Sequence, residues 1–148
     1  MPRYSCRMVK YSMLKKILII EDEATQLLLL QTRFAGRGFT VFTASNGEDG
    51  FRKAVAEKPD LILMDMLLPG MTGLEVCQRL QELPETRPIP VLLVTASGMR
   101  DLEDRCKQFG IAGCLMKPYQ LSELFQKIET IFPSQQNSVG TDGARSKA

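Results

Sequence analysis

Short runs of apolar residues alternate along the chain with longer stretches that are apolar on one side only. The runs Leu18-Ile19-Ile20 and Leu61-Ile62-Leu63-Met64 contain no polar residue, as is usual for parallel strands covered on both faces. The apolar runs predict strands at residues 17–20, 39–43, 61–64, 89–94 and 113–116. The amphipathic stretches predict helices at residues 24–37, 47–58, 73–83, 99–109 and 122–131.

This alternation of strand and helix is typical of an α/β fold. Strands joined by helices form a parallel sheet with right-handed crossovers and helices on both of its faces. Asn46 and Thr72 stand where N-caps of the second and third helices are needed. Ser122 is the candidate N-cap of the last helix, without a capping box, and Gly110 stands where the fourth helix should end.

The first predicted helix contains four consecutive leucines, at residues 27–30. At about 100° per residue, Leu29, Leu30 and Phe34 share a face that we expect to enter the core, with Leu27 at its edge. Leu28 then points away from the core.

Composition predicts one globular domain, at residues 15–132. The chain has 148 residues, of which 44% are hydrophobic and 24% charged. It contains neither the ~20 consecutive apolar residues of a membrane span nor a secretory signal, so we expect a cytoplasmic protein without membrane contact. Residues 1–14 are predicted to be a flexible basic arm or a mis-assigned start, with Met13 as the alternative start. Residues 133–148 are predicted to be a disordered tail too polar to form an output domain.

The net charge of +2 does not indicate a nucleic-acid-binding protein. Residues 1–16 contain five basic residues and no acid, and residues 133–148 carry a net +1, which leaves −4 on residues 17–132. An acidic domain lacks the positive surface that attracts a phosphate backbone.

Histidine is absent, and the four cysteines (Cys6, Cys77, Cys106 and Cys114) show no C-x-x-C spacing. This excludes histidine-based catalysis and argues against a thiolate metal site. In a cytoplasmic protein we expect these cysteines to be reduced and mostly buried.

Chemically active residues follow the predicted strands. Glu21 and Asp22 follow the first predicted strand, Asp65 follows the third, Thr95 the fourth and Lys117 the fifth. In an open α/β sheet, ligands bind beyond the carboxyl ends of the strands. Clustered carboxylates offer oxygen ligands to Mg²⁺, a carboxylate can attack phosphorus, and a hydroxyl and an ammonium can hold phosphoryl oxygens. Each residue alone is also explained as a cap, a strand end or a solvated charge, so the prediction depends on their combination.

The chain resembles the receiver domains of two-component response regulators, in particular stand-alone members of the chemotaxis type. The resemblance covers about residues 15–132 and is carried by residues 17–23 (ILIIEDE), 61–75 (LILMDMLLPGMTGLE), 94–96 (VTA) and 117–119 (KPY). It implies a flavodoxin-like, doubly wound, five-stranded parallel sheet of strand order 2-1-3-4-5 with five helices.

The resemblance also implies a function for each site residue. Asp65 is expected to accept a phosphoryl group from a histidine kinase or a histidine phosphotransfer protein, with Mg²⁺ as cofactor, and so to switch the binding of a downstream protein. Thr95 and Lys117 are expected to contact the phosphoryl group, and Lys117-Pro118 to be a cis peptide. The implied Mg²⁺ ligands are Asp22, Asp65, Glu21 through water, and the backbone carbonyl of Leu67.

Two positions depart from the family pattern. Cys114 stands where an aromatic residue is common, and Leu67 stands where some members carry a polar residue that positions water. The first departure bears on the output mechanism, and the second bears on the rate of dephosphorylation. Leu28 is either a harmless exposed residue or, as the resemblance implies for this helix, a contact for the kinase.

Two other functions fit the sequence less well. A Mg²⁺-dependent phosphatase with an aspartate nucleophile commonly needs a second carboxylate two residues later, where this chain has Leu67. A degenerate receiver that binds partners without phosphorylation would not need Asp22, Asp65, Thr95 and Lys117 together. A phosphoacceptor switch, which is not an enzyme acting on a separate substrate, remains the prediction.

Overall fold

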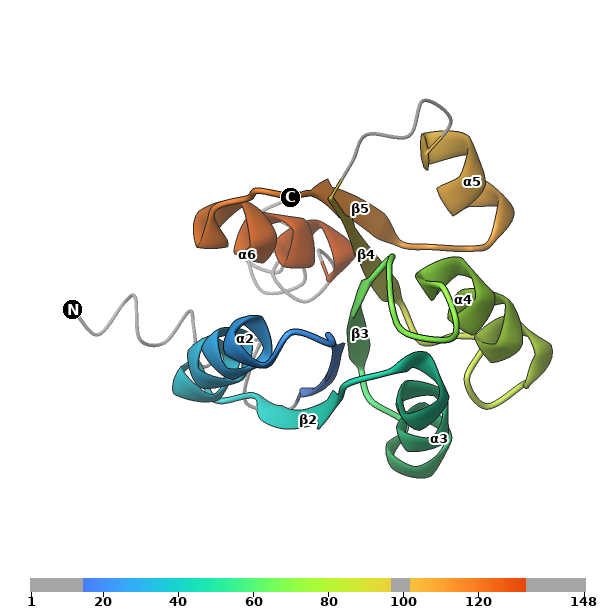
Figure 1. Ribbon diagram of the computed structural model, residues 1–148, viewed down its shortest axis with the longest axis horizontal. Helices are drawn as coiled ribbons and strands as arrows, with labels where there is room; N and C mark the ends of the chain where they lie inside the picture. The colour runs from blue at the N-terminus through green and yellow to red at the C-terminus, as the bar shows by residue number, and fades with distance from the viewer. Residues whose placement is uncertain (1–14, 97–101, 133–148) are drawn as a thin grey trace, which may run out of the picture.

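A computed structural model of the chain describes residues 15–96 and 102–132, with the backbone alone at residues 102 and 103. Its centre is a five-stranded parallel sheet of order β2-β1-β3-β4-β5 (Figure 1). The strands are β1 (Lys16–Ile20), β2 (Thr40–Ala44), β3 (Leu61–Asp65), β4 (Val91–Thr95) and β5 (Gly113–Met116). The predicted α/β fold and strand order are confirmed.

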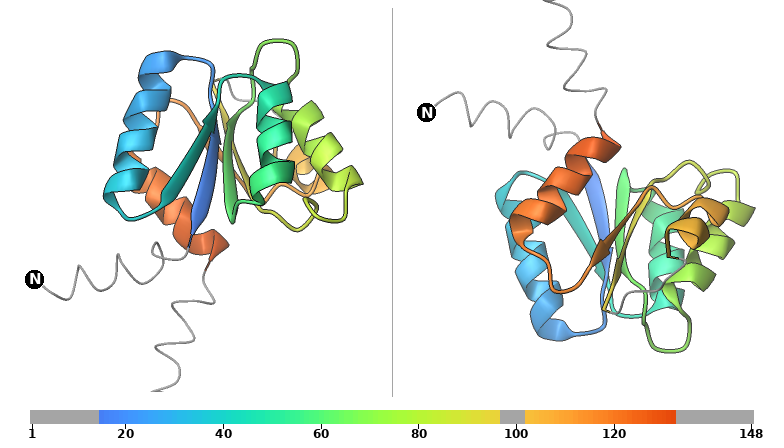
Figure 2. Two further views of the ribbon diagram at one scale, coloured as in Figure 1. Left: turned by 90° about the horizontal axis from the view of Figure 1, so that it is seen from below. Right: turned by 90° about the horizontal axis from the view of Figure 1, so that it is seen from above.

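The helices form two layers, one on each face of the sheet (Figure 2). The first layer contains α2 (Ala24–Gly36) and α6 (Leu121–Ile131). The second contains α3 (Gly47–Glu57), α4 (Gly73–Glu82) and α5 (Leu102–Gln108). Among the described residues these are the five expected helices; residues 99–101 of the predicted fourth helix lie outside the described part.

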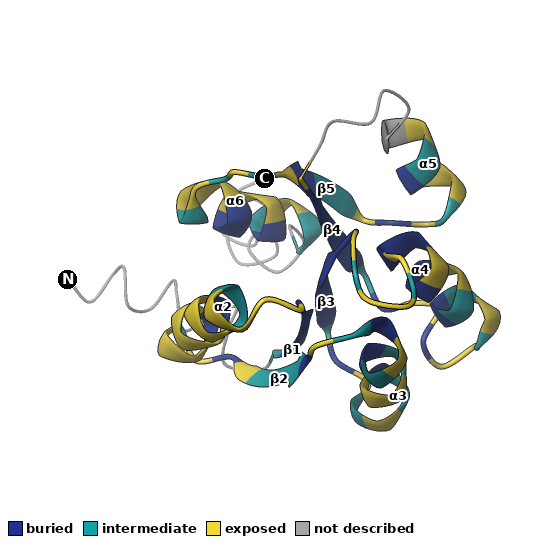
Figure 3. Ribbon diagram, viewed as in Figure 1, coloured by how far each residue is buried: buried dark blue, intermediate teal, exposed yellow. Residues whose placement is uncertain are grey.

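The sheet separates two hydrophobic clusters, because side chains alternate between its faces. Ile17 and Ile19 of β1 pack in the cluster beneath α2 and α6, whereas Leu18 and Ile20 pack in the cluster beneath α3, α4 and α5. The central strands β1, β3 and β4 are almost wholly buried (Figure 3). Full burial of one such side chain contributes roughly 1.5–3 kcal/mol to the stability of the fold. The buried strands therefore fix the position of their carboxyl ends, which lie at one edge of the sheet.

Two predicted N-caps are confirmed by hydrogen bonds. The Asn46 side chain accepts a bond of 2.8 Å from the backbone N–H of Asp49. Thr72 forms a capping box with Glu75: Thr72 Oγ1 accepts from Glu75 N at 3.2 Å, and Glu75 Oε1 accepts from Thr72 N at 2.9 Å. The cap fixes where α4 begins, eight positions after Asp65 along the chain.

The predicted N-cap of α6 is wrong. The N-cap is Gln120 rather than Ser122, and the helix begins at Leu121. The backbone N–H of Gln120 donates to Glu123 Oε1 at 2.8 Å. Counted from Gln120, Glu123 is the third helical residue and can reach back to the cap, which it could not do as the residue next to Ser122.

The predicted start of the fourth strand was too early. Ile89 donates its backbone N–H to the carbonyl of Thr86 at 3.1 Å, which closes a turn, and β4 begins only at Val91. Apolar character alone does not distinguish a buried turn residue from a strand residue.

The prediction that Leu29 enters the core is wrong, although Leu30 and Phe34 do enter it. Leu30 and Phe34 are 3% and 0% exposed, whereas Leu29 is 42% exposed. Leu27, Leu30 and Phe34 follow one another at spacings of three and four and set the buried face. Leu29 lies about 100° from Leu30 and farther from the other two, so it points away from that face. The expected exposure of Leu28 is confirmed, at 63%.

The expectation of reduced cysteines is wrong for two of them. Cys106 of α5 and Cys114 of β5 form a disulfide, with Cα atoms 7.3 Å apart. Cys77 is free and buried in the core, as expected. The two bonded cysteines are eight positions apart, a separation that matches no common cysteine motif.

None of the helices in the described parts of the chain has the length and apolar character that a bilayer crossing requires.

Candidate functional site

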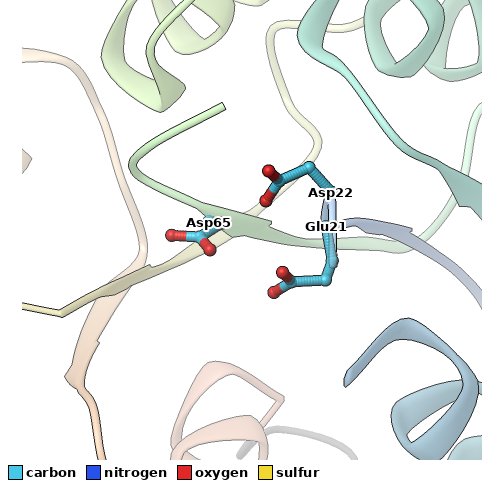
Figure 4. Close-up of side chains that lie close together, drawn as sticks. All are labelled: Glu21, Asp22 and Asp65. Carbon is cyan, nitrogen blue, oxygen red and sulfur yellow. The ribbon is translucent and has the colours of Figure 1, made fainter. Parts of the chain in front are cut away.

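Three carboxylates meet at the carboxyl edge of the sheet (Figure 4). Glu21 and Asp22 follow β1, and Asp65 ends β3, the strand that pairs with β1 in parallel register. One oxygen atom from each side chain lies within 4.8 Å of the others. Strand pairing thus brings together acids that are more than forty positions apart in the sequence.

Two of these acids are buried, and burial changes the chemistry of Glu21. Glu21 is 5% exposed and Asp65 is 9% exposed, whereas Asp22 is exposed. Burial raises the pKa of Glu21 above its ordinary value. A hydrogen bond of 3.0 Å from the backbone N–H of Glu23 and the charge of Lys117 lower that pKa, but they do not cancel the effect of burial.

Lys117 places a positive charge against two of these acids. Its Nζ lies 3.0 Å from Asp65 Oδ2, to which it donates a hydrogen bond, and 3.6 Å from Glu21 Oε1. Burial alone would lower the pKa of Lys117, but the hydrogen bond and charge of Asp65, together with the charge of Glu21, raise it above its ordinary value. Lys117 is therefore held in its charged form.

The backbone around Lys117 is tied to the neighbouring strand. The Lys117-Pro118 peptide is cis, as the family resemblance implied. The backbone N–H of Lys117 donates to the carbonyl of Thr95 at 2.7 Å. Thr95 ends β4, which lies between β3, the strand of Asp65, and β5, the strand that leads to Lys117. Its side chain is buried, at 3% exposure.

The loop after β3 folds back over Asp65. The backbone N–H of Leu67 donates to Asp65 Oδ1 at 3.3 Å, while the Leu67 side chain is 65% exposed. The Leu67 backbone is thus next to the carboxylate, and the predicted role of its carbonyl as a metal ligand stays a prediction.

Gly73 is a residue of this site that the sequence analysis did not identify. Its N–H donates to the carbonyl of Met66 at 2.7 Å. A Cβ atom at Gly73 would lie 2.8 Å from the backbone oxygen of Asp65 and 2.8 Å from Leu93 Cδ1. The sequence did offer a signal for Gly73. It is the first helical residue after the cap Thr72, a position where almost any other residue would favour the helix more than glycine does.

This arrangement suits a divalent cation. Mg²⁺ and similar ions bind carboxylate oxygens, and a few protein ligands suffice because the ion keeps several waters. The three acids supply such oxygens on one side, and the ammonium of Lys117 approaches Asp65 without being able to ligate a cation. Chemically, the edge can hold a cation and a group of negatively charged oxygens at Asp65 together.

A shallow surface with a mixed polar and apolar lining lies over α2 and α6, next to this edge. One groove of about 730 Å³ is lined in part by Leu28, Leu29, Leu121 and Phe125. A second hollow of about 420 Å³ shares Leu29 and Leu121 with it and reaches Lys117. The exposed leucines of α2 are thus connected to the acidic site.

Comparison with known proteins gives a consistent result. The family model of the response regulator receiver domain matches residues 17–129. Sporulation initiation phosphotransferase F of Bacillus subtilis is 33% identical, over 83% of this chain and 98% of its own length. Polar-differentiation response regulator DivK of Brucella anthropi is 34% identical, over 78% of this chain and 94% of its own length.

Other relatives are longer than this chain. Phosphate regulon transcriptional regulatory protein PhoB of Rhizobium meliloti is 33% identical over 80% of this chain, but the match spans only 52% of its own length. The chain thus covers about half of such transcriptional regulators.

Solved structures resemble the whole sheet. A putative response regulator from Chloroflexus aurantiacus has a TM-score of 0.73 at 30% identity and matches over 79% of this chain and 96% of its own. Chemotaxis response regulator CheY4 of Vibrio cholerae has a TM-score of 0.74 at 24% identity, over 79% of this chain and 98% of its own, and supports the fold.

Proposed function

The chain belongs to the family of response regulator receiver domains, and on that premise we propose that Asp65 is the residue that accepts the phosphoryl group. Members of this family are phosphorylation-activated signalling domains. The observation that carries the assignment is the environment of Asp65. Its carboxylate contacts Lys117 Nζ at 3.0 Å and lies beside Glu21 and Asp22 at the carboxyl edge of the sheet.

In the proposed reaction, a carboxylate oxygen of Asp65 attacks the phosphorus of a phosphohistidine on the donor protein. The new bond is P–O, the P–N bond breaks, and the leaving imidazole nitrogen keeps the electron pair and takes a proton from solvent. The product is an acyl phosphate on Asp65. Lys117 neutralises charge on the phosphoryl oxygens from its position at Asp65, and Thr95 contacts the group from the end of β4.

We propose that Mg²⁺ is held by Asp22, Asp65 and the backbone carbonyl of Leu67, and by Glu21 through water. The fit rests on three carboxylate oxygens within 4.8 Å of one another, an arrangement that is repulsive without a cation. When bound, Mg²⁺ supplies positive charge to the phosphoryl oxygens and orients them toward Asp65.

The donor is proposed to be a histidine kinase or a histidine phosphotransfer protein that docks on α2. Leu28 is 63% exposed and Leu29 is 42% exposed, and both line the groove between α2 and α6. The groove continues into the hollow that reaches Lys117, so a helix packed on it would bring a side chain to the acidic edge. This arrangement favours the interpretation of Leu28 as a docking contact over that of a harmless exposed leucine.

The acceptor is tested with acetyl phosphate, a small acyl phosphate that needs no docking. We expect wild-type protein to take up one phosphoryl group only when Mg²⁺ is present, through a base-labile linkage. Asp65→Asn should abolish uptake, and Asp104→Asn, which removes an exposed acid of α5, should not. The measurement is intact-protein mass with and without hydroxylamine. Stable labelling of a serine or threonine would contradict the assignment.

The docking surface is tested by Leu28→Asp. A charge in a packed apolar contact is costly, so transfer from the cognate kinase should slow at least tenfold, while labelling by acetyl phosphate is unchanged. Gln31→Asp is the matched control, because it places the same charge on an exposed position of α2 that does not line the groove. If Leu28→Asp and Gln31→Asp accept phosphoryl groups from the kinase at equal rates, Leu28 is only a surface residue.

A further inference from the structure

A disulfide joins two elements beside the site, and it has no part in the function proposed above. It links Cys106 in α5 to Cys114 in β5. Cys106 is 6% exposed and lies in the cluster beneath α3, α4 and α5, and the half-buried Cys114 packs against that cluster. Figure 1 shows α5 next to β5, at one edge of the fold.

In the part of α5 whose side chains are described, the buried contact with the rest of the domain is made by Cys106. Among the α5 side chains that the structure describes, at residues 104–108, Cys106 alone is buried; Arg105 is half-buried and the other three are exposed. Its partner Cys114 lies on β5, an edge strand that pairs with β4 alone. A covalent bond at this point therefore restrains a helix that has little other apolar anchorage in its described part.

The same bond connects the two backbone segments that lead to the phosphoryl-contacting residues. α5 follows β4, which ends in Thr95, and Cys114 lies three positions before Lys117. The backbone N–H of Lys117 also donates to the carbonyl of Thr95 at 2.7 Å. The chain that leaves Thr95 and the chain that arrives at Lys117 are thus joined twice, once at the site and once through the disulfide.

We propose that Cys106 and Cys114 are a reversible thiol–disulfide pair, and that oxidation tethers α5 to β5 and limits the response of α5 to phosphorylation. The first part stands on the position of the two cysteines. The second part rests on the proposed function of Asp65, because it requires a phosphoryl group at the site.

The oxidant is a small-molecule disulfide such as oxidised glutathione. The Cys114 thiolate attacks one of its sulfur atoms, forms a mixed disulfide and releases one thiolate. The Cys106 thiolate then attacks the Cys114 sulfur and releases the second, so that two protein thiols and one small disulfide give one protein disulfide and two small thiols. Cys114 is assigned the first step because it is the more exposed of the two.

Cys77 provides an internal contrast. It is 2% exposed, and burial raises the pKa of its thiol to about 12. Its thiolate form is therefore rare near neutral pH, and we expect it to remain a thiol under the same treatment.

The first experiment counts thiols in protein that carries Cys6→Ser, since Cys6 lies outside the described residues. After treatment with oxidised glutathione, denaturation and alkylation, we expect one alkyl group, on Cys77; after dithiothreitol, we expect three. In Cys106→Ser the remaining Cys114 should form a mixed disulfide with glutathione faster than Cys106 does in Cys114→Ser. Three alkyl groups after both treatments, or a disulfide that includes Cys77, would show that Cys106 and Cys114 are not a reversible thiol–disulfide pair.

The second experiment measures amide hydrogen exchange of residues 102–112 in oxidised and reduced protein. Because the tether removes freedom from the opened helix, we expect exchange of α5 to be roughly tenfold faster after reduction. Cys106→Ser should exchange fast under both conditions, and Cys77→Ala should keep the difference. Equal exchange in oxidised and reduced protein would overturn the tether.

The coupling is measured by repeating this exchange after labelling with acetyl phosphate and Mg²⁺. Both forms should be labelled to the same extent, and phosphorylation should change exchange of α5 in the reduced form only. If phosphorylation changes the exchange of α5 equally in the oxidised and reduced forms, or in neither, the disulfide does not limit the response of α5. Failure of both forms to take up phosphate would instead count against the proposed function, whereas the thiol count would still decide the pair.

Discussion

At the scale of single residues, the site is dominated by charge. Like charges about 4 Å apart, at an effective dielectric of about 20, repel by about 4 kcal/mol before screening and relaxation. Glu21, Asp22 and Asp65 stand close enough to feel such repulsion, and the single ammonium of Lys117 contacts Glu21 and Asp65. One ammonium cannot neutralise three carboxylates, so part of their repulsion remains. Because the free energy of unfolding of a whole domain is only about 5–15 kcal/mol, this repulsion lowers the stability noticeably.

Asp22→Ala should therefore raise the stability of the metal-free protein. Asp22 is the exposed member of the cluster, so its removal relieves repulsion without leaving a cavity. We expect the melting temperature in chelator to rise by about 2–6 °C. Excess Mg²⁺ should stabilise the wild type by binding the folded state, and Asp22→Ala should lose most of that effect.

Calorimetric melting with chelator and with Mg²⁺ checks both parts. Glu85→Ala is the control, because Glu85 is an exposed acid outside the cluster, and it should leave both temperatures nearly unchanged. A wild type that shows no Mg²⁺ shift, or an Asp22→Ala protein that keeps the full shift, would mean that these acids do not share one cation.

At the scale of elements, the position of Asp65 depends on how closely α4 approaches the end of β3. The capping box of Thr72 and Glu75 sets the first turn of α4, and Gly73 then passes the backbone of Asp65 at a distance that leaves no room for a Cβ. The helix start and the strand end are thus packed directly against each other. A side chain between them would move one element or the other.

Gly73→Ala should destabilise the fold and impair phosphorylation together. Its Cβ would meet Asp65 O and Leu93 Cδ1, each at 2.8 Å, and overpacking of this kind costs about 1–3 kcal/mol. Because one of the displaced atoms is the Asp65 carbonyl oxygen, we expect slower labelling by acetyl phosphate as well. Urea unfolding and the labelling rate are the two measurements.

Gly36→Ala is the matched control for this substitution. Gly36 ends α2, and a Cβ there would meet nothing within 4 Å. The substitution should be neutral or slightly stabilising, because alanine favours a helix over glycine. Equal stability of the Gly73→Ala and Gly36→Ala proteins would show that the approach of α4 to β3 is not tight.

At the scale of the whole molecule, stability comes from two clusters that share the central strands. The cluster beneath α2 and α6 contains Ile17, Phe34 and Ile128, each 0% exposed, and the cluster beneath α3, α4 and α5 contains Leu18 and Ile62, also 0% exposed. Residues of β1 occur in both clusters. Loss of one helix therefore exposes one face of the same strands that support the site.

Deletion of residues 1–12 and 134–148 should leave melting temperature and phosphorylation almost unchanged. Neither segment has an apolar pattern that would form part of a core, so we expect a shift below about 2 °C. A deletion of residues 128–148 is the control: it also removes Ile128, and it should lower the melting temperature sharply. A large drop after the first deletion would show that one of the two segments packs on the domain.

Patterns read along the chain were sufficient for most of the local structure. The alternation of apolar runs and amphipathic stretches predicted every strand and helix of the described residues within a few positions, and side-chain chemistry predicted the caps Asn46 and Thr72. The acids, Thr95 and Lys117 were identified as a group because they follow strands that end at one edge. The order of those strands came from resemblance to a known family, since periodicity carries no information about which strands are neighbours.

Only the tertiary structure decided how these parts meet. It exposed Leu29 beside the buried Leu30, and it joined Cys106 to Cys114 without a sequence motif. It also placed Lys117 Nζ 3.0 Å from Asp65 Oδ2, across 52 positions of sequence. The physical reason is that helix and strand patterns reflect the periodic exposure of one element, whereas contacts between elements depend on the order of the strands and on how closely the helices pack against them.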